Sequence, residues 1–206
     1  MKNSITEIVC ILDRSGSMAG LESDVVGGFN ATLEEQKGKD GSAFISTVLF
    51  DTKSDVLHDR LPIESVAPMT RADFRVGGCT ALYDALGDAI AHIETIHKYI
   101  RPEDVPEKTL FVITTDGMEN ASRRYTAKKL RALIKEKEAL GWEFIFLAAN
   151  IDADVAASEI GISRDHTAEF VTDSAGVSAC YAMVSETIST VRRRDKVTTE
   201  KWRKKK

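Results

Sequence analysis

The sequence predicts an α/β fold in which helices cover both faces of a mostly parallel central sheet. Short apolar runs rich in β-branched residues alternate with longer segments of helical period, as in strands joined by helical crossovers. With 206 residues, of which 43% are hydrophobic and 29% charged, the chain can form one domain with a full core and is short for two. We therefore expect a single, doubly wound domain.

Six strands are expected from the apolar runs at residues 7–12, 42–50, 54–57, 109–115, 143–149 and 168–171. Three residues, 51–53, separate the second and third runs, which is too few for a crossover. These two strands should therefore pair as an antiparallel hairpin at one edge of the sheet. Residues 62–77 contain two prolines and show no clear period, so no regular element is assigned to them.

Helices are expected where apolar residues recur at a spacing of three or four. Thr126 is suited to cap one of them and Gly141 to follow its C-terminal end. A short helix is expected near residues 154–160. The inward faces of the four longer helices are predicted to be Leu21, Val25, Phe29 and Leu33; Leu82, Leu86, Ile90, Ile93 and His97; Leu130, Leu133, Ile134 and Leu140; and Val177, Tyr181, Val184, Ile188 and Val191.

The formal charge of −4 is distributed unevenly along the chain. From Arg192 onward there are nine Lys or Arg against two Asp or Glu, so residues 192–206 carry +7 and residues 1–191 carry −11. We interpret residues 1–191 as the domain and residues 192–206 as a basic tail, either a fraying helix end or a disordered terminus. Contact of this tail with an acidic surface or nucleic acid is the alternative.

Composition also bears on the compartment. The longest apolar runs, residues 8–12 and 144–149, are much shorter than the roughly 20 residues that cross a bilayer. Residues 1–10 contain no apolar stretch of signal-peptide length. Cys10, Cys79 and Cys180 are odd in number and lack zinc-binding spacing, which favours reduced thiols. We therefore expect a cytoplasmic protein without a membrane segment.

Oxygen-bearing side chains follow two of the predicted strands and precede the helix between them. Asp13, Ser15 and Ser17 come after the first strand, Asp116 after the fourth, and Thr80 before the second long helix. In an open α/β sheet, ligands bind beyond the carboxyl ends of the strands, so these side chains should converge. Carboxylates and hydroxyls without imidazole or thiolate favour a hard cation, and we predict Mg²⁺ or Mn²⁺ rather than zinc.

Three segments at these positions, ILDRSGSM, GGCTALYDAL and TTDGMENAS, resemble the metal-site segments of von Willebrand factor A-type (vWA) domains. The resemblance covers about residues 5 to 191 and is to the stand-alone, intracellular, prokaryotic-like type, with its Rossmann-like layout. It implies a metal-ion-dependent adhesion site (MIDAS). In such a site Ser15, Ser17 and Thr80 coordinate through hydroxyls, Asp13 and Asp116 bind directly or through water, and the sixth position receives a ligand.

The function expected from this site is protein binding and not catalysis. Neutral hydroxyls leave the charge of the ion incompletely cancelled, so the carboxylate of an Asp or Glu on a partner protein would be attracted to it. The resemblance implies partners such as an ATP-driven ring protein or a component of a metal-resistance or chelatase-like system.

Two alternatives stay open at this point. One is a Mg²⁺-dependent phosphatase or phosphotransferase with Asp13 as its nucleophile. That chemistry needs a second acid at the position of Ser15, and the chain has neither a P-loop nor a Gly-x-Ser-x-Gly motif. The other is a structural scaffold with a degenerate metal site. Beside the predicted site, Cys79 is interpreted as a small packing residue and not as a reactive thiol.

Overall fold

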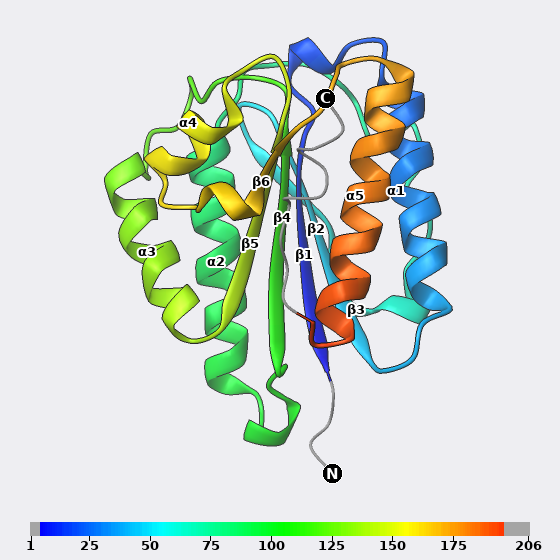
Figure 1. Ribbon diagram of the computed structural model, residues 1–206, viewed down its shortest axis with the longest axis vertical. Helices are drawn as coiled ribbons and strands as arrows, with labels where there is room; N and C mark the ends of the chain where they lie inside the picture. The colour runs from blue at the N-terminus through cyan, green and yellow to red at the C-terminus, as the bar shows by residue number, and fades with distance from the viewer. Residues whose placement is uncertain (1–4, 196–206) are drawn as a thin grey trace.

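The computed structural model describes residues 5–195 as one six-stranded sheet between two layers of helices (Figure 1). The strands are β1 (Thr6–Asp13), β2 (Ala43–Phe50), β3 (Ser54–Pro62), β4 (Lys108–Thr115), β5 (Trp142–Ala148) and β6 (Thr167–Glu169). Their order is β3-β2-β1-β4-β5-β6, and every neighbouring pair is parallel except β2 and β3. The predicted α/β class and its antiparallel edge hairpin are confirmed.

The helices lie on both faces of the sheet, as Figure 1 shows. The α-helices are α1 (Glu22–Lys37), α2 (Leu82–Tyr99), α3 (Ala127–Ala139), α4 (Ala153–Glu159) and α5 (Ser174–Arg192), and short 3₁₀ turns occur at Gly16–Met18, Ile63–Ser65, Pro102–Asp104 and Arg164–His166. Helices α1 and α5 pack on one face, and α2, α3 and α4 on the other. Strand β1 serves both cores, because side chains alternate along a strand: Ile8 faces α1 and α5, whereas Val9 faces the opposite layer.

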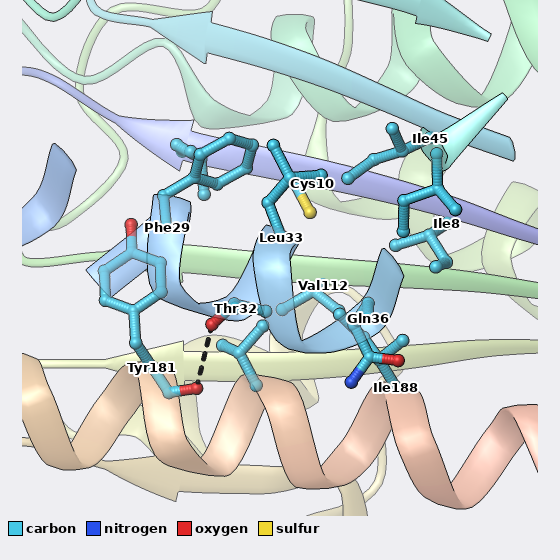
Figure 2. A pocket seen from close by; sticks show the side chains of 13 residues that line it. Ile8, Cys10, Phe29, Thr32, Leu33, Gln36, Ile45, Val112, Tyr181 and Ile188 are labelled. Carbon is cyan, nitrogen blue, oxygen red and sulfur yellow. Dashed lines mark hydrogen bonds between the residues drawn. The ribbon is translucent and has the colours of Figure 1, made fainter. Parts of the chain in front are cut away.

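Helices α1 and α5 approach each other closely over the sheet. A Cβ atom placed on Gly28 would lie 2.4 Å from the ring of Tyr181, so only a glycine leaves room for that ring. Figure 2 shows the neighbouring interior, where Thr32 donates a hydrogen bond to the Tyr181 carbonyl at 3.3 Å. A cavity of about 10 Å³ lies there between side chains such as Cys10 and Leu33. It is about the size of one water and mostly apolar, so it is expected to stay dry.

The far ends of α1 and α5 are joined by buried polar contacts. The Gln36 amide donates to Ser189 Oγ at 2.8 Å and to the Ser185 carbonyl at 3.0 Å. The Arg192 guanidinium donates to the carbonyls of Gln36, at 2.5 Å, and of Gly41, at 2.8 Å. It also reaches the carbonyls of Lys39 and Asp40. Arg192, the last residue of α5, therefore caps the C-terminal end of α1, whose last carbonyls have no partner within the helix.

Arg192→Ala is expected to lower the free energy of unfolding by about 2 kcal/mol, because hydrogen bonds from a charged donor are each worth about 1.5–3 kcal/mol. Urea denaturation measures this change. Arg193→Ala is the matched control, since Arg193 is exposed and its ion pair is with the nearby Asp195. Equal stability of the two variants would contradict the capping role.

Several expectations need correction. Leu140, predicted to face inward, is 69% exposed, because α3 ends at Ala139 and Leu140 lies beyond its last turn. Lys137 turns inward instead, where its ammonium contacts Glu94 and Glu136 at 2.5 and 2.7 Å. Cys79 is exposed and is not a packing residue. Strand β3 is longer than expected, continuing to Pro62.

Helix α5 ends at Arg192, the residue at which the predicted basic tail begins. Residues 196–206, most of the predicted basic tail, lie outside the described residues. Within residues 5–195, no helix is long and apolar enough to span a membrane.

Candidate metal centre

The predicted site residues come together at the carboxyl ends of β1 and β4, which are neighbours in the middle of the sheet. The loop after β1 is also tied to the segment that precedes α2. The Gly16 amide donates to the Gly78 carbonyl at 3.3 Å, and the Gly77 amide donates to the Arg14 carbonyl at 3.0 Å. The pairing of β1 with β4 and these backbone contacts together bring three segments that are distant in sequence to one point above the sheet.

Hydroxyl and carboxylate oxygens form a connected set at this point. Ser15 Oγ lies 3.2 Å from Ser17 Oγ, which donates to Asp116 Oδ1 at 2.6 Å. A Cβ atom placed on Gly117 would lie 3.3 Å from Thr80 Oγ1 and 3.7 Å from Ser17 Oγ, so the two hydroxyls flank the same space. The site side chains predicted from the sequence therefore lie next to one another, although they come from three different segments.

Asp13 is buried, with 2% of its surface exposed. Its Oδ1 accepts a hydrogen bond from the Ser15 amide at 2.7 Å, and its Oδ2 accepts one from Thr115 Oγ1 at 2.6 Å. Burial raises the pKa of this carboxyl, although these hydrogen bonds act to lower it. Thr115, which the sequence reasoning passed over, therefore holds the Asp13 side chain in place.

Asp116 is as buried as Asp13, but the hydrogen bonding of its carboxylate is less complete. Among residues 5–195, its Oδ2 has no hydrogen-bond partner. Burial raises the pKa of the Asp116 carboxyl, the Ser17 hydrogen bond lowers it, and the negative charge of Asp13 raises it further. These two buried carboxyls lie near each other, and one of them has an oxygen without a partner among the described residues. A bound cation would stabilise both negative charges.

The donor set fits a hard divalent cation. The described part of the chain contains no cluster of three or more His, Cys, Asp and Glu that could hold a metal, so hydroxyls would have to complete the shell. Ser15, Ser17 and Thr80 offer three such oxygens beside the carboxylates of Asp13 and Asp116. Oxygen-only donors of this kind suit Mg²⁺ or Mn²⁺ better than zinc.

The position of Thr80 is determined by a residue that the sequence reasoning missed. The side-chain Oδ1 of Asn120 accepts a hydrogen bond from the Thr80 backbone N–H at 3.0 Å. The backbone N–H of Asn120 donates to the Thr80 carbonyl, also at 3.0 Å. This two-point contact joins the loop after β4 to the segment that precedes α2. The signal was present in the segment TTDGMENAS, where Asn120 comes four residues after Asp116.

Two further acids join the same loop to α2. They do not belong to the metal centre itself. Glu119 accepts the Tyr83 amide at 2.8 Å, in the first turn of α2. Asp84 accepts the amides of residues 123–125 at 2.9–3.0 Å. Burial acts to raise the pKa of Asp84, but these amides hold it below its usual value. Glu119 and Asp84 are positioning residues and are not candidate ligands.

Comparisons with known proteins bear on the fold. No protein-family model matches the chain, and no curated protein matches it in sequence. Solved structures do match. The proximal thread matrix protein 1 of the mussel byssus, described with zinc in its MIDAS motif, has a TM-score of 0.57 and 14% identity over 88% of this chain and 45% of that one.

Two bacterial structures extend the comparison. A von Willebrand factor type A protein from Catenulispora acidiphila has a TM-score of 0.58 and 17% identity, over 88% of this chain and 42% of that one. The vWF domain of the type V pilus tip protein Mfa5 from Porphyromonas gingivalis has a TM-score of 0.65 and 11% identity, over 94% of this chain and 98% of that one. The chain has the vWA fold.

The vWA fold of this chain corresponds to one unit of larger proteins in several of these matches. It spans less than half of the mussel protein and of the Catenulispora protein, but nearly all of the Mfa5 domain. At 11–17% identity the comparisons establish the fold and leave the site to be argued from this chain's own residues.

Two neighbours of the site in this vWA fold contact the β2–β3 hairpin. Arg14, inside the first segment, forms an ion pair with Asp51 at 2.9 Å and also contacts Asp55. It therefore links the β1 loop to the β2–β3 turn. The Cys79 amide donates to Thr52 Oγ1 at 2.9 Å, which joins the segment before α2 to that same turn.

Proposed function

We propose that this chain is a protein-binding module that works through one Mg²⁺ or Mn²⁺ ion held by Asp13, Ser15, Ser17, Thr80 and Asp116. The ion would bind an Asp or Glu carboxylate of a partner protein. The observation that carries the proposal is the buried Oδ2 of Asp116, which has no hydrogen-bond partner among the described residues. Three hydroxyls lie close to this carboxylate, and one of them donates to its other oxygen. An unpaired buried carboxylate oxygen is costly unless it has a ligand to bind.

The roles of the residues follow from their contacts. Ser15, Ser17 and Thr80 are neutral donors, so they would leave much of the ion's charge uncancelled. Asp13, restrained by the Ser15 amide and Thr115, would orient its carboxylate toward the ion or toward a water bound to it. When bound, the cation supplies a localised positive charge that attracts a carboxylate. That attraction grows from about 1 to about 4 kcal/mol at 4 Å as the contact is shielded from water.

The comparisons support a metal site in this fold, since the mussel protein is described with zinc in its MIDAS motif. The identity of the ion in the present chain rests on its own oxygen donors, which favour Mg²⁺ or Mn²⁺. As partners we propose proteins of the cytoplasm, such as an ATP-driven ring protein or a member of a metal-resistance or chelatase-like system, on the family resemblance.

Phosphotransfer through Asp13 is less well supported than binding. Both carboxylate oxygens of Asp13 already accept short hydrogen bonds, and the side chain is 2% exposed, so its approach to a phosphorus atom is obstructed. Ser15, two residues on, supplies a hydroxyl where a general acid would be required.

Calorimetric titration of Mn²⁺ and Mg²⁺ into chelator-stripped protein tests the metal site. We expect binding heat for the wild type and none for Asp13→Ala/Asp116→Ala, because the double variant removes both carboxylates of the set. Circular dichroism confirms that the variant remains folded. Binding of equal strength by both proteins would show that the ion binds elsewhere and would overturn the proposal.

Water-proton relaxation of the Mn²⁺-loaded protein tests whether one coordination position of the ion is open to a carboxylate. Acetate serves as the probe and should lower the relaxation enhancement as it replaces water at the ion. Tetramethylammonium chloride at the same ionic strength is the control. If acetate and the control salt act alike, the carboxylate-binding role fails even though the metal site stands.

A further inference from the structure

An apolar groove lies next to the proposed metal centre, between the loop after β4 and helix α4. We call it the Met118 groove. Its apolar lining consists of Leu82, Met118, Phe146, Ile151, Val155 and Ala156. Gly117 and Glu119 also line it, so the groove begins one residue after the candidate ligand Asp116.

The Met118 groove has the size and exposure of a docking site for one large side chain. Its volume is about 230 Å³, below the roughly 300–1,000 Å³ of small-molecule pockets. Met118 is 71% exposed and Val155 is 54% exposed, whereas core side chains in this protein are nearly fully buried. Large exposed apolar residues grouped around a hollow mark an interaction surface.

The rim of the groove is acidic. Asp152 and Glu159 line it, and both are exposed. Asp152 Oδ1 accepts the Val155 amide, and Glu159 accepts the Tyr83 hydroxyl. Neither forms an ion pair within residues 5–195. An occupant that fits this surface carries a carboxylate for the metal, an apolar side chain close to it, and basic residues for the rim.

The chain itself contains such a segment. Residues 200–206 read Glu-Lys-Trp-Arg-Lys-Lys-Lys, with one carboxylate at Glu200, one large aromatic side chain at Trp202 and five cations. The charges also match, because residues 192–206 carry +7 and residues 1–191 carry −11. These residues lie outside the described part of the structure.

Within one molecule this segment follows a helix that ends far from the metal centre. Helix α5 runs away from the carboxyl ends of the strands, and its last residues contact Gly41 and Glu107 at the opposite end of the sheet (Figure 1). Its 19 residues span about 28 Å. The five residues from Asp195 to Glu200 extend at most about 18 Å. Fully extended, that stretch is shorter than helix α5, which favours the metal centre of a second copy as the site for Glu200.

We propose that residues 200–206 of one molecule bind the metal centre and the Met118 groove of a second molecule. Glu200 supplies the carboxylate to the ion, Trp202 enters the groove, and the lysines and arginine approach Asp152 and Glu159. The contact joins unlike surfaces, so it generates rings or open chains. This inference rests on the proposed function, because it names the partner of that same metal centre.

Sedimentation velocity on the full chain over a concentration series tests the inference, with Mn²⁺ or with EDTA. We expect self-association in Mn²⁺ and monomers in EDTA. Glu200→Gln and Trp202→Ala should each weaken the association roughly tenfold or more, as truncation of central contacts does. Lys128→Gln, at an exposed lysine outside both the segment and the groove, is the control and should have a small effect. Glu200→Gln makes the tail more positive, so a purely electrostatic contact would be strengthened by it.

A mixing experiment tests the head-to-tail arrangement directly. Asp116→Ala keeps the tail but loses the metal centre, and Glu200→Gln keeps the metal centre but loses the tail carboxylate. Each variant alone should be monomeric in Mn²⁺, and the mixture should form one-to-one dimers. Monomers in the mixture, or association that persists in EDTA, would overturn the inference.

Metal titration of the same samples distinguishes failure of this inference from failure of the proposed function. If wild type and Glu200→Gln both bind Mn²⁺ but neither associates, the inference fails and the metal site stands. If the wild type binds no Mn²⁺, the proposed function fails with it.

Discussion

Saturating Mn²⁺ is expected to raise the free energy of unfolding of the wild-type chain and to leave that of Asp116→Ala unchanged. A ligand that binds the folded state alone stabilises it by about 2.7 kcal/mol at a free concentration 100 times its dissociation constant. The unfolded chain cannot bring together three segments separated by 36 residues or more, so it should bind the ion poorly. Thermal and urea denaturation, each with Mn²⁺ and with EDTA, measure the effect.

Without metal, Asp116→Ala should be no less stable than the wild type. The substitution loses the hydrogen bond from Ser17, but it also removes a buried carboxylate oxygen that has no partner among the described residues. Leaving such a group unpaired costs about 1–3 kcal/mol. Asp59→Ala, at an exposed acid paired with His92, is the control and should respond to Mn²⁺ like the wild type. A less stable Asp116→Ala protein in EDTA would mean that this side chain serves the fold.

Gly78→Ala is expected to damage both stability and metal binding. Gly78 has φ +73°, a conformation that costs other residues about 1–2 kcal/mol. A Cβ atom there would also lie 2.7 Å from Thr52 Oγ1, the group that accepts the Cys79 amide. The loop must shift to relieve this contact, and Thr80 lies two residues further on. We expect about 2 kcal/mol of destabilisation and Mn²⁺ binding at least roughly tenfold weaker.

Gly77→Ala is a closely matched control for this experiment. It adds the same methyl group one residue earlier, where no atom lies within 4 Å and φ is not in the left-handed region. The control should keep both its unfolding midpoint and its affinity for Mn²⁺. If both variants behave like the wild type, the loop before Thr80 tolerates movement and its geometry does not limit metal binding.

Much of the architecture could be predicted because local pattern and fold agree here. The strands β1, β4 and β5 are buried on both faces and appear in the sequence as continuous apolar runs. The three-residue turn between β2 and β3 forces an antiparallel pair, and Gly141 was identified as the end of α3, where its φ is +88°. The five candidate ligands were also found from sequence, since each follows a strand or precedes a helix at the sheet edge where ligands collect.

Other features depend on contacts between distant segments, which local pattern does not report. Lys137 occupies an inward position on α3 because Glu94 of α2 lies within reach, and Leu140 is exposed because the helix ends one residue before it. Asn120 and Thr115 are ordinary polar residues in sequence, and they become positioning groups when the loop after β4 meets Thr80 and Asp13.

The fold class, the hairpin and the chemical type of the candidate centre could be predicted from the sequence, because hydrophobic period, turn length and side-chain chemistry are local properties of the chain. The tertiary structure alone decided which oxygens are already paired, that Asp116 Oδ2 is left without a partner in the described residues, and that the Met118 groove opens beside it. These are properties of packing, since burial and pairing depend on which segments, more than 30 residues apart, fold against one another.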